Sequence, residues 1–340
     1  MTVAATARIA RRRRVVAVTS GLGVIVAALL VGTMMIGDVA LGPWEVFAAV
    51  TRLGDDAAVD FIVLELRLPT ASTALVAGVA LGVAGMIFQT LLANPLASPD
   101  LIGISSGASL FAVGSIVFLH ASAIVVAGAA LSGAFLAAAL IYVLAFRDGL
   151  TGYRFILVGI GVTEFVTALI AWVLAKAEIN DAREAMTWLV GSVGQAGSLQ
   201  LQLLAGGVAV LVPLAMAAGR ILRLLELGDD SAHGLGLRVE GARLAMIGVA
   251  VTLTALATAA VGPLAFVALT AGPIAARLLR GAGVGILSAG LVGAVVVLAG
   301  DLVAAHALPV ALPTGVVTGA VGAPYLIWLL ATVNREGRGG

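Results

Sequence analysis

Residues 94–100 read Asn-Pro-Leu-Ala-Ser-Pro-Asp and separate two long apolar runs of the chain. Two prolines, an Asn and an Asp cannot continue an α-helix, because proline lacks the backbone N–H and its ring clashes with the preceding turn. The runs on either side, 69–92 and 103–119, have or approach the length of about 20 residues that crosses a bilayer. This stretch therefore predicts a loop that joins two membrane-spanning helices.

The composition is that of a polytopic membrane protein. Hydrophobic residues make up 61% of the 340 residues and charged residues only 11%, whereas about a quarter of the residues in a soluble domain are charged. Apolar runs of more than about 18 residues occur repeatedly, and a soluble core cannot bury that much apolar surface. We therefore expect an all-α protein in contact with the lipid bilayer.

The apolar segments divide the chain into a short basic N-terminus at 1–14, one transmembrane domain at 15–333 and a tail at 334–340. The first apolar stretch is longer than the 7–15 residues of a cleaved signal peptide, so we interpret it as a retained first span. We predict ten spans, at 15–36, 69–92, 103–119, 122–146, 154–175, 199–219, 242–261, 264–280, 284–304 and 315–333.

The basic residues give an independent indication of topology. If the N-terminus is cytoplasmic, 15 of the 19 Lys and Arg residues lie on the cytoplasmic side, as the positive-inside rule requires. An even number of spans then places the C-terminus in the cytoplasm as well. Two external segments, 37–67 and 176–198, are long enough to fold on the membrane surface, and the first contains a helix start at Pro43.

Several kinds of chemistry are excluded by what the sequence lacks. There is no Cys, so thiolate metal ligands and disulfides are impossible. The only Lys is Lys176, between two alanines, so no phosphate-binding P-loop exists. His120, His233 and His306 lack metal-ligand spacing, and no nucleophile–base pair or nucleic-acid patch stands out. We expect no catalytic residues, no metal site and no cofactor bound by this chain.

Four stretches carry a family resemblance. They are 78–91, the loop at 94–100, 262–277, and the C-terminal 312–325, which reads Leu-Pro-Thr-Gly-Val-Val-Thr-Gly-Ala-Val-Gly-Ala-Pro-Tyr. In this order the stretches resemble permeases of the iron-siderophore and cobalamin ABC importer family (FecCD type). The resemblance implies a type II ABC importer permease architecture in the inner membrane of a prokaryote. It also implies ATP-binding cassette ATPase subunits, an extracytoplasmic substrate-binding protein, and a second copy of this chain or a sister permease as partners.

The resemblance further implies roles for two cytoplasmic segments. Asn94, Pro95 and Leu96 would act near a cytoplasmic gate. The segment 220–240 would dock into the ATPase as a coupling element, and its glycines indicate short helical pieces with stiff breaks. Its candidate coupling residues are Leu227, Gly228, Asp229, Asp230, Ala232, His233, Gly234, Leu235 and Gly236.

On the outer side, Arg67 in Leu64-Glu-Leu-Arg-Leu-Pro-Thr70 matches the first arginine of the family's Arg-Leu-Pro-Arg motif. That arginine meets acidic residues of the binding protein in the family. Thr70 stands in place of the second arginine, and Arg52 is a candidate to compensate for it. An interfacial anchor is the other interpretation of Arg67.

Two acidic residues fall inside predicted spans. Glu164 lies near the bilayer midplane, where a carboxylate is costly and is a functional candidate by default. It either lines a pathway, relays protons or is held between helices, and the family offers no role for it. Asp301 lies near the outer end of the ninth span, and we interpret it as a helix-packing residue in preference to a substrate contact. The cargo expected from the resemblance is a ferric siderophore, with cobalamin and haem still open. A proton-coupled secondary transporter using Glu164, or a channel, is the alternative.

Overall fold

The computed structural model describes residues 3–336, apart from residue 55, residues 148–150, residues 283–284 and residue 308. Within that part every regular element is a helix. In chain order the elements are α1 (Val3–Met35), α2 (Pro43–Thr51), α3 (Ala57–Asp60), the π-helix η1 (Phe61–Arg67), α4 (Leu68–Leu91), α5 (Pro99–Ile102), α6 (Ile104–Leu119), α7 (Ala123–Ala145), α8 (Gly152–Lys176), α9 (Ile179–Val190), the 3₁₀ helix η2 (Val193–Gln195), α10 (Ser198–Ala217), α11 (Gly219–Leu225), α12 (Asp229–Gly234), α13 (Val239–Val261), α14 (Val267–Leu279), α15 (Ile286–His306) and α16 (Thr314–Glu336).

The predicted all-α membrane architecture is confirmed. Among the described residues, seven helical segments are long and apolar enough to cross a membrane, and three shorter apolar helices accompany them. Each of the ten predicted spans overlaps one of these segments. The seven long segments are Ile9–Met35, Ala57–Leu91, Ala123–Ala145, Gly152–Lys176, Ser198–Ala217, Val239–Val261 and Ile286–His306, and the shorter ones are Ile104–Leu119, Val267–Leu279 and Thr314–Leu329.

Two helices begin before the membrane spans predicted for them. α1 begins at Val3 and not at residue 15, because arginine is a good helix former and its charge ends the apolar stretch without ending the helix. The second long helix begins at Ala57 and not at 69. Pro69 is accommodated because it lies in the first turn of α4, directly after the wider turns of η1. At the other end, α16 continues to Glu336, and the remaining tail lies outside the described residues.

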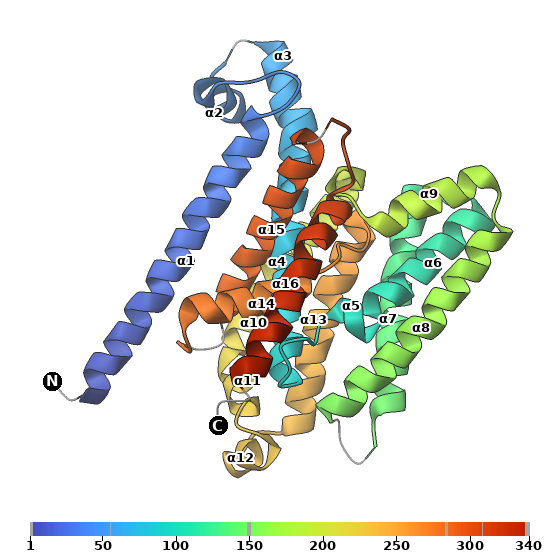
Figure 1. Cartoon of the computed structure of the whole chain (residues 1–340). Helices are drawn as coiled ribbons and strands as arrows, with labels where there is room; N and C mark the ends of the chain where they lie inside the picture. Colours follow the sequence, from blue (N-terminus) through green and yellow to red (C-terminus); the bar gives the residue numbers. More distant parts are fainter. Residues whose placement is uncertain (1–2, 55, 148–150, 283–284, 308, 337–340) are drawn as a thin grey trace.

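α4 is the central helix of the molecule (Figure 1) and packs against α10, α13, α14 and α15. In the most apolar stretch of the segment Ala57–Leu91, which includes α4, 78% of the residues are buried. In the corresponding stretch of α1 only 11% are buried, so α1 lies on the outside of the bundle. Close approach of α4 and α15 depends on glycine: a Cβ on Gly78 would lie 2.5 Å from the carbonyl oxygen of Gly293. Small residues at such crossings let membrane helices pack backbone to backbone.

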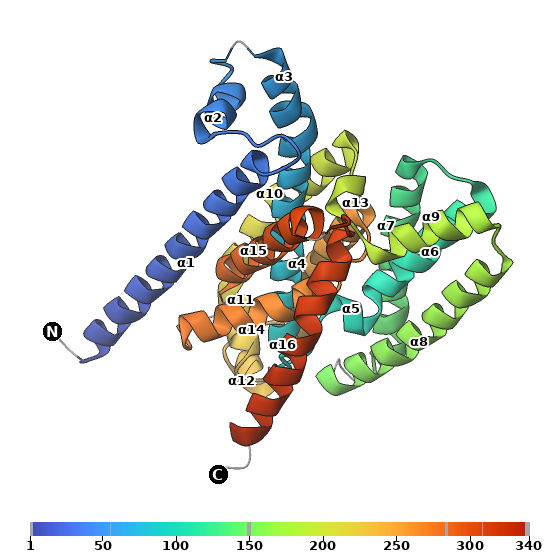
Figure 2. The same ribbon diagram turned by 45° about the horizontal axis from the view of Figure 1, so that its top comes forward.

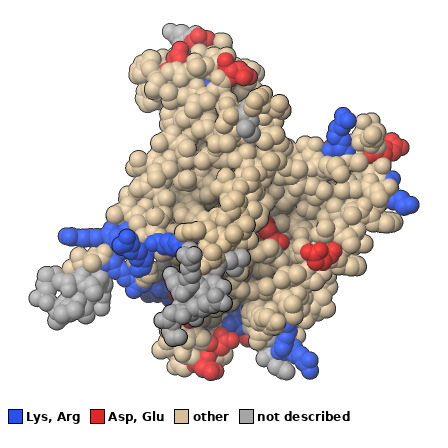
Figure 3. All heavy atoms as spheres, in the orientation of Figure 1, with Lys and Arg blue, Asp and Glu red and all other residues tan. Residues whose placement is uncertain are grey.

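Both termini lie at the same end of the molecule as α12, and α2, α3 and α9 lie at the opposite end (Figures 1 and 2). This arrangement agrees with an even number of spans. Figure 3 shows Lys and Arg gathered at the end that carries the N-terminus. The helix predicted from Pro43 is present as α2, and α9 covers most of the second surface segment.

Candidate functional site

The candidate coupling segment forms short helices, as its glycines indicated. α11 and α12 are separated by a break at Gly228, whose φ is +91°, and α12 is followed by Gly236 with a φ of +84°. These left-handed values favour glycine because a Cβ would clash with the backbone. Leu227 and Leu235 beside the two breaks are 60% and 63% exposed. The segment therefore presents two apolar side chains at rigid turns.

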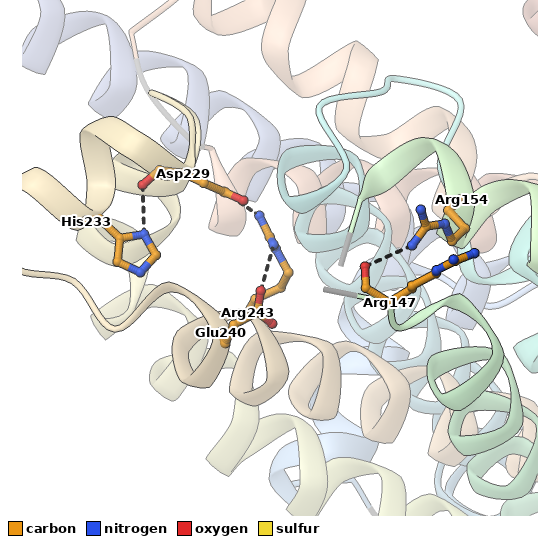
Figure 4. A network of polar contacts seen from close by, with 6 residues as sticks. All are labelled: Arg147, Arg154, Asp229, His233, Glu240 and Arg243. Atoms are coloured by element: carbon orange, nitrogen blue, oxygen red, sulfur yellow. Dashed lines mark hydrogen bonds and ion pairs between the residues drawn. The ribbon is translucent and has the colours of Figure 1, made fainter. Parts of the chain in front are cut away.

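An ion pair ties α12 to the start of α13. The Arg243 guanidinium is buried and donates to Oδ1 of Asp229 at 2.6 Å, and Glu240 lies 3.7 Å from the same guanidinium (Figure 4). Nδ1 of His233 lies 3.1 Å from the carbonyl oxygen of Asp229. Asp229, the first residue of α12, is thus tied to α13 by its side chain and to His233 near the end of α12 by its carbonyl oxygen.

The candidate gate is a compact turn. Oδ1 of Asn94 accepts the backbone N–H of Leu96 at 2.9 Å, a local Asx turn. Gln89 then holds this turn in place: its Nε2 donates to the carbonyl oxygens of Pro95 and of Leu269 in α14, both at 3.0 Å. Gln89 and Leu269 are buried, so the bond between them is shielded from competing water, whereas Pro95 is exposed.

A small cavity of about 200 Å³ brings the gate and the coupling segment together. Asn94 and Pro95 line one side, Gly272 and Pro273 of α14 another, and Glu226, next to the coupling residues, a third. Partial burial raises the pKa of the Glu226 carboxyl, and the Arg223 guanidinium opposes the shift. At this cavity only one layer of side chains separates the coupling segment from the gate turn and from α14. A movement of the coupling segment would therefore be transmitted directly to both.

The two arginines predicted to dock a binding protein differ in their surroundings. Arg67 donates to the carbonyl oxygens of Met34 at 2.7 Å and Val39 at 2.6 Å. These bonds connect the C-terminal end of α1 to the loop that follows it. Arg52 ends α2 in the left-handed region with φ +56°, and its side chain is exposed. The docking role stays a prediction for both residues, and Arg52 has the freer guanidinium in this geometry.

The remaining candidates are placed as follows. Glu164 is exposed on α8, so the chain itself does not bury it between helices. Asp301 in α15 accepts a hydrogen bond from Thr314 at the start of α16, 2.8 Å away, which is a helix-packing contact. His120 lies 3.4 Å from Asp181 and joins α6 to α9. In the part of the chain that the structure describes, no three His, Asp or Glu side chains are grouped to hold a metal ion.

Sequence reasoning assigned no role to Gln89 or Arg243. A polar amide within an apolar helix is a signal that could have singled out Gln89, since membrane helices rarely carry one without a partner. Arg243 was counted only as a topology marker, and nothing in the sequence indicated that it would be buried against Asp229.

Comparison with known proteins gives a consistent result. The model of the FecCD transport family matches residues 24–332. The ferric enterobactin transport system permease protein FepG of Escherichia coli (strain K12) is 40% identical over 302 residues, which cover 88% of this chain and 91% of the relative. The achromobactin transport system permease protein CbrC of Dickeya dadantii (strain 3937) is 37% identical, covering 90% of this chain and 88% of that protein.

A solved structure shares the fold. A metal-chelate type ABC transporter in an inward-facing conformation superposes with a TM-score of 0.82. The alignment covers 92% of this chain and 98% of that chain at 22% identity. The helical architecture described above is therefore that of a known ABC transporter permease.

Proposed function

This chain belongs to the FecCD transport family, and from that membership we propose that it is the membrane-spanning permease subunit of an ABC importer for a ferric siderophore. The observation that carries the proposal is the 40% identity to FepG over most of both chains. Other relatives are named for import of iron(3+)-hydroxamate and of Fe(3+)-citrate. Ferric iron held in an organic chelate is common to the names of these relatives.

The proposed importer needs partners, because the chain has no P-loop of its own. Separate ATP-binding cassette subunits hydrolyse ATP on the cytoplasmic side, and an extracytoplasmic binding protein delivers the chelate. A second copy of this chain or a sister permease completes the pore. The chain lies in the cytoplasmic membrane as one transmembrane domain with both termini in the cytoplasm, and it binds no cofactor.

The proposed mechanism uses the coupling segment and the gate as one unit. α12 docks into the ATPase together with the exposed Leu227 and Leu235 on either side of it, and the Asp229–Arg243 pair keeps it stiff. Force transmission requires an element that moves as a body, which a floppy loop cannot provide. Glu226 and the cavity beside Asn94 connect this body to the gate turn, so ATP-driven movement opens or closes the cytoplasmic exit.

The experiment that tests the proposal is uptake of radiolabelled ferric siderophores in cells lacking only this chain. A panel with a catecholate, a hydroxamate and ferric citrate is measured with and without restoration of the gene. Loss of uptake of at least one chelate and its rescue are expected. Unchanged uptake of all three in a strain without a second iron importer would overturn the proposal.

The alternative, a proton-coupled secondary transporter using Glu164, is not favoured, because the family match runs through nearly the whole chain. Glu164→Gln separates the two functions, since glutamine keeps the shape of the side chain and cannot relay a proton. We expect uptake to continue and to depend on ATP. Uptake that collapses in this variant, or with the proton gradient alone, would favour the alternative.

A further inference from the structure

A cavity of about 480 Å³ lies between the α5–α6 and α8 side of the molecule and the start of α16. The end of α9 and the loop between α13 and α14 close it from another direction. This volume falls within the range of about 300–1,000 Å³ typical of pockets for small organic ligands. Its polar lining residues are Asp100, Ser105, Ser106, Ser109 and Thr167, and Gly315 lines it at the start of α16.

Asp100 is the charged group of this cavity. Its Oδ1 accepts a hydrogen bond from Ser105 Oγ at 2.6 Å. Its Oδ2 is buried and has no hydrogen-bond partner among the described residues. An unpaired buried carboxylate oxygen is costly, so this position favours a ligand that donates a hydrogen bond or carries positive charge.

Three of the neighbouring hydroxyl groups already donate their protons to other acceptors. Ser105 gives its proton to Asp100, Ser109 gives its proton to the carbonyl oxygen of Ser105 at 2.9 Å, and Thr167 donates to that of Thr163 at 2.8 Å. Each hydroxyl oxygen keeps lone pairs that can still accept. None of the described lining residues is basic. The polar part of the lining therefore carries one carboxylate and several acceptor oxygens, and the rest of the wall, at Ile170, Leu189, Val190, Pro263 and Ala265, is apolar.

Glu164 adds a second negative charge nearby. It lies three residues before Thr167 on α8, a spacing that makes two side chains neighbours on a helix surface. Its carboxylate is exposed, so it can attract a cation approaching that face of α8.

We propose that this cavity is a subsite for a cationic, hydrogen-bond-donating side group of the transported chelate, such as a terminal ammonium. The inference rests on the proposed function and adds to it a preference for one class of ferric chelate. Asp100 accepts the ammonium directly, and the Ser and Thr oxygens complete its shell of acceptors. The permease then carries an ammonium-bearing chelate faster than the same chelate with that charge removed.

The test compares a ferric trihydroxamate that ends in a primary ammonium with its N-acetylated, neutral form. Initial uptake rates of both are measured at concentrations below saturation in cells that express the complete importer. The receptor is the same in every strain, so a change in the ratio of the two rates reports on the permease. Asp100→Asn is the variant, since asparagine keeps the shape of the side chain and can still accept the bond from Ser105.

We expect Asp100→Asn to lower the ammonium-to-neutral uptake ratio about tenfold, the size of a lost hydrogen bond to a charged group. Asp301→Asn is the matched control, because it also changes a carboxylate within the helical bundle but does not line this cavity. The control should keep the wild-type ratio. An unchanged ratio in Asp100→Asn, or an equal fall in both variants, overturns the inference and leaves the proposed function standing. Failure of the wild-type importer to take up any ferric chelate would overturn both.

Discussion

Nε2 of Gln89 and the carbonyl oxygen of Leu269 are 3.0 Å apart, although 180 residues separate them in the chain. The same nitrogen donates to the carbonyl oxygen of Pro95. One buried side chain therefore joins the gate turn to α14. A Cβ on Gly272 of α14 would collide with the Gln89 carboxamide, so the approach of the two helices depends on glycine at that position.

Replacing Gln89 by leucine should loosen the gate. The change leaves the carbonyl oxygens of Pro95 and Leu269 without this donor, and for the buried oxygen of Leu269 the cost is about 1–3 kcal/mol. We expect ATP-driven uptake to fall several-fold while ATP hydrolysis continues. Because the chain has no cysteine, Leu96→Cys can report gate opening through its rate of maleimide labelling, which should rise in the double variant.

The control for this prediction is Gln202→Leu, which changes an exposed glutamine on α10. Its labelling rate and uptake should equal those of the parent protein. Normal coupling and slow labelling in Gln89→Leu would contradict the gate role.

Removal of the Asp229 carboxylate should release α12 from α13. Asp229→Ala leaves the buried Arg243 without its 2.6 Å partner, and we expect a loss of stability of about 1–3 kcal/mol. Transport per ATP hydrolysed should fall in the same variant. Glu240→Gln is the control: both carboxylates are half exposed, but Glu240 lies 3.7 Å from Arg243 and makes no direct hydrogen bond at that distance, so its contribution is about 0–1 kcal/mol. Thermal unfolding and coupled uptake in proteoliposomes measure both effects, and equal behaviour of the two variants would disprove the difference.

The two left-handed glycines of the coupling segment should not tolerate a side chain. Gly228→Ala and Gly236→Ala each force alanine to a positive φ, which costs about 1–2 kcal/mol. Open space surrounds both positions, so an added Cβ would not collide with a neighbouring residue. Any loss of coupling therefore arises from strain in the residue's own backbone at a positive φ. Gly234→Ala, inside α12 and equally unobstructed, should be neutral or slightly stabilising. ATPase stimulation in the assembled importer is the measurement, and loss in the Gly234 variant alone would refute the argument.

Arg52 and Arg67 should separate into a surface role and a structural role. Arg67→Met removes the donors to Met34 and Val39, so the melting temperature should fall. Arg52→Glu should leave the melting temperature unchanged and weaken binding of the extracytoplasmic receptor, with an effect that shrinks at high salt. Surface plasmon resonance at two salt concentrations tests this. Normal receptor binding by both Arg52→Glu and Arg67→Glu would remove these arginines from the interface.

Much of this architecture follows from local sequence. Apolar length and proline placement predict the ten helical segments and the break at 94–100, because hydrophobicity and a missing N–H act on the residues that carry them. The glycine breaks around α12 are equally local. The starts of α1 and of the second long helix were missed, because arginine and a proline in a first turn interrupt a pattern without interrupting a helix.

The sequence by itself thus determined the helical membrane fold, the order of its segments and the positions of the turns that we propose as gate and coupling element. Only the tertiary structure decided which polar groups meet: Gln89 with Leu269, Asp229 with Arg243, and Arg67 with the end of α1. These contacts join residues up to 180 positions apart. The physical reason is that a buried donor must find whichever acceptor the packing of other helices brings within 3 Å.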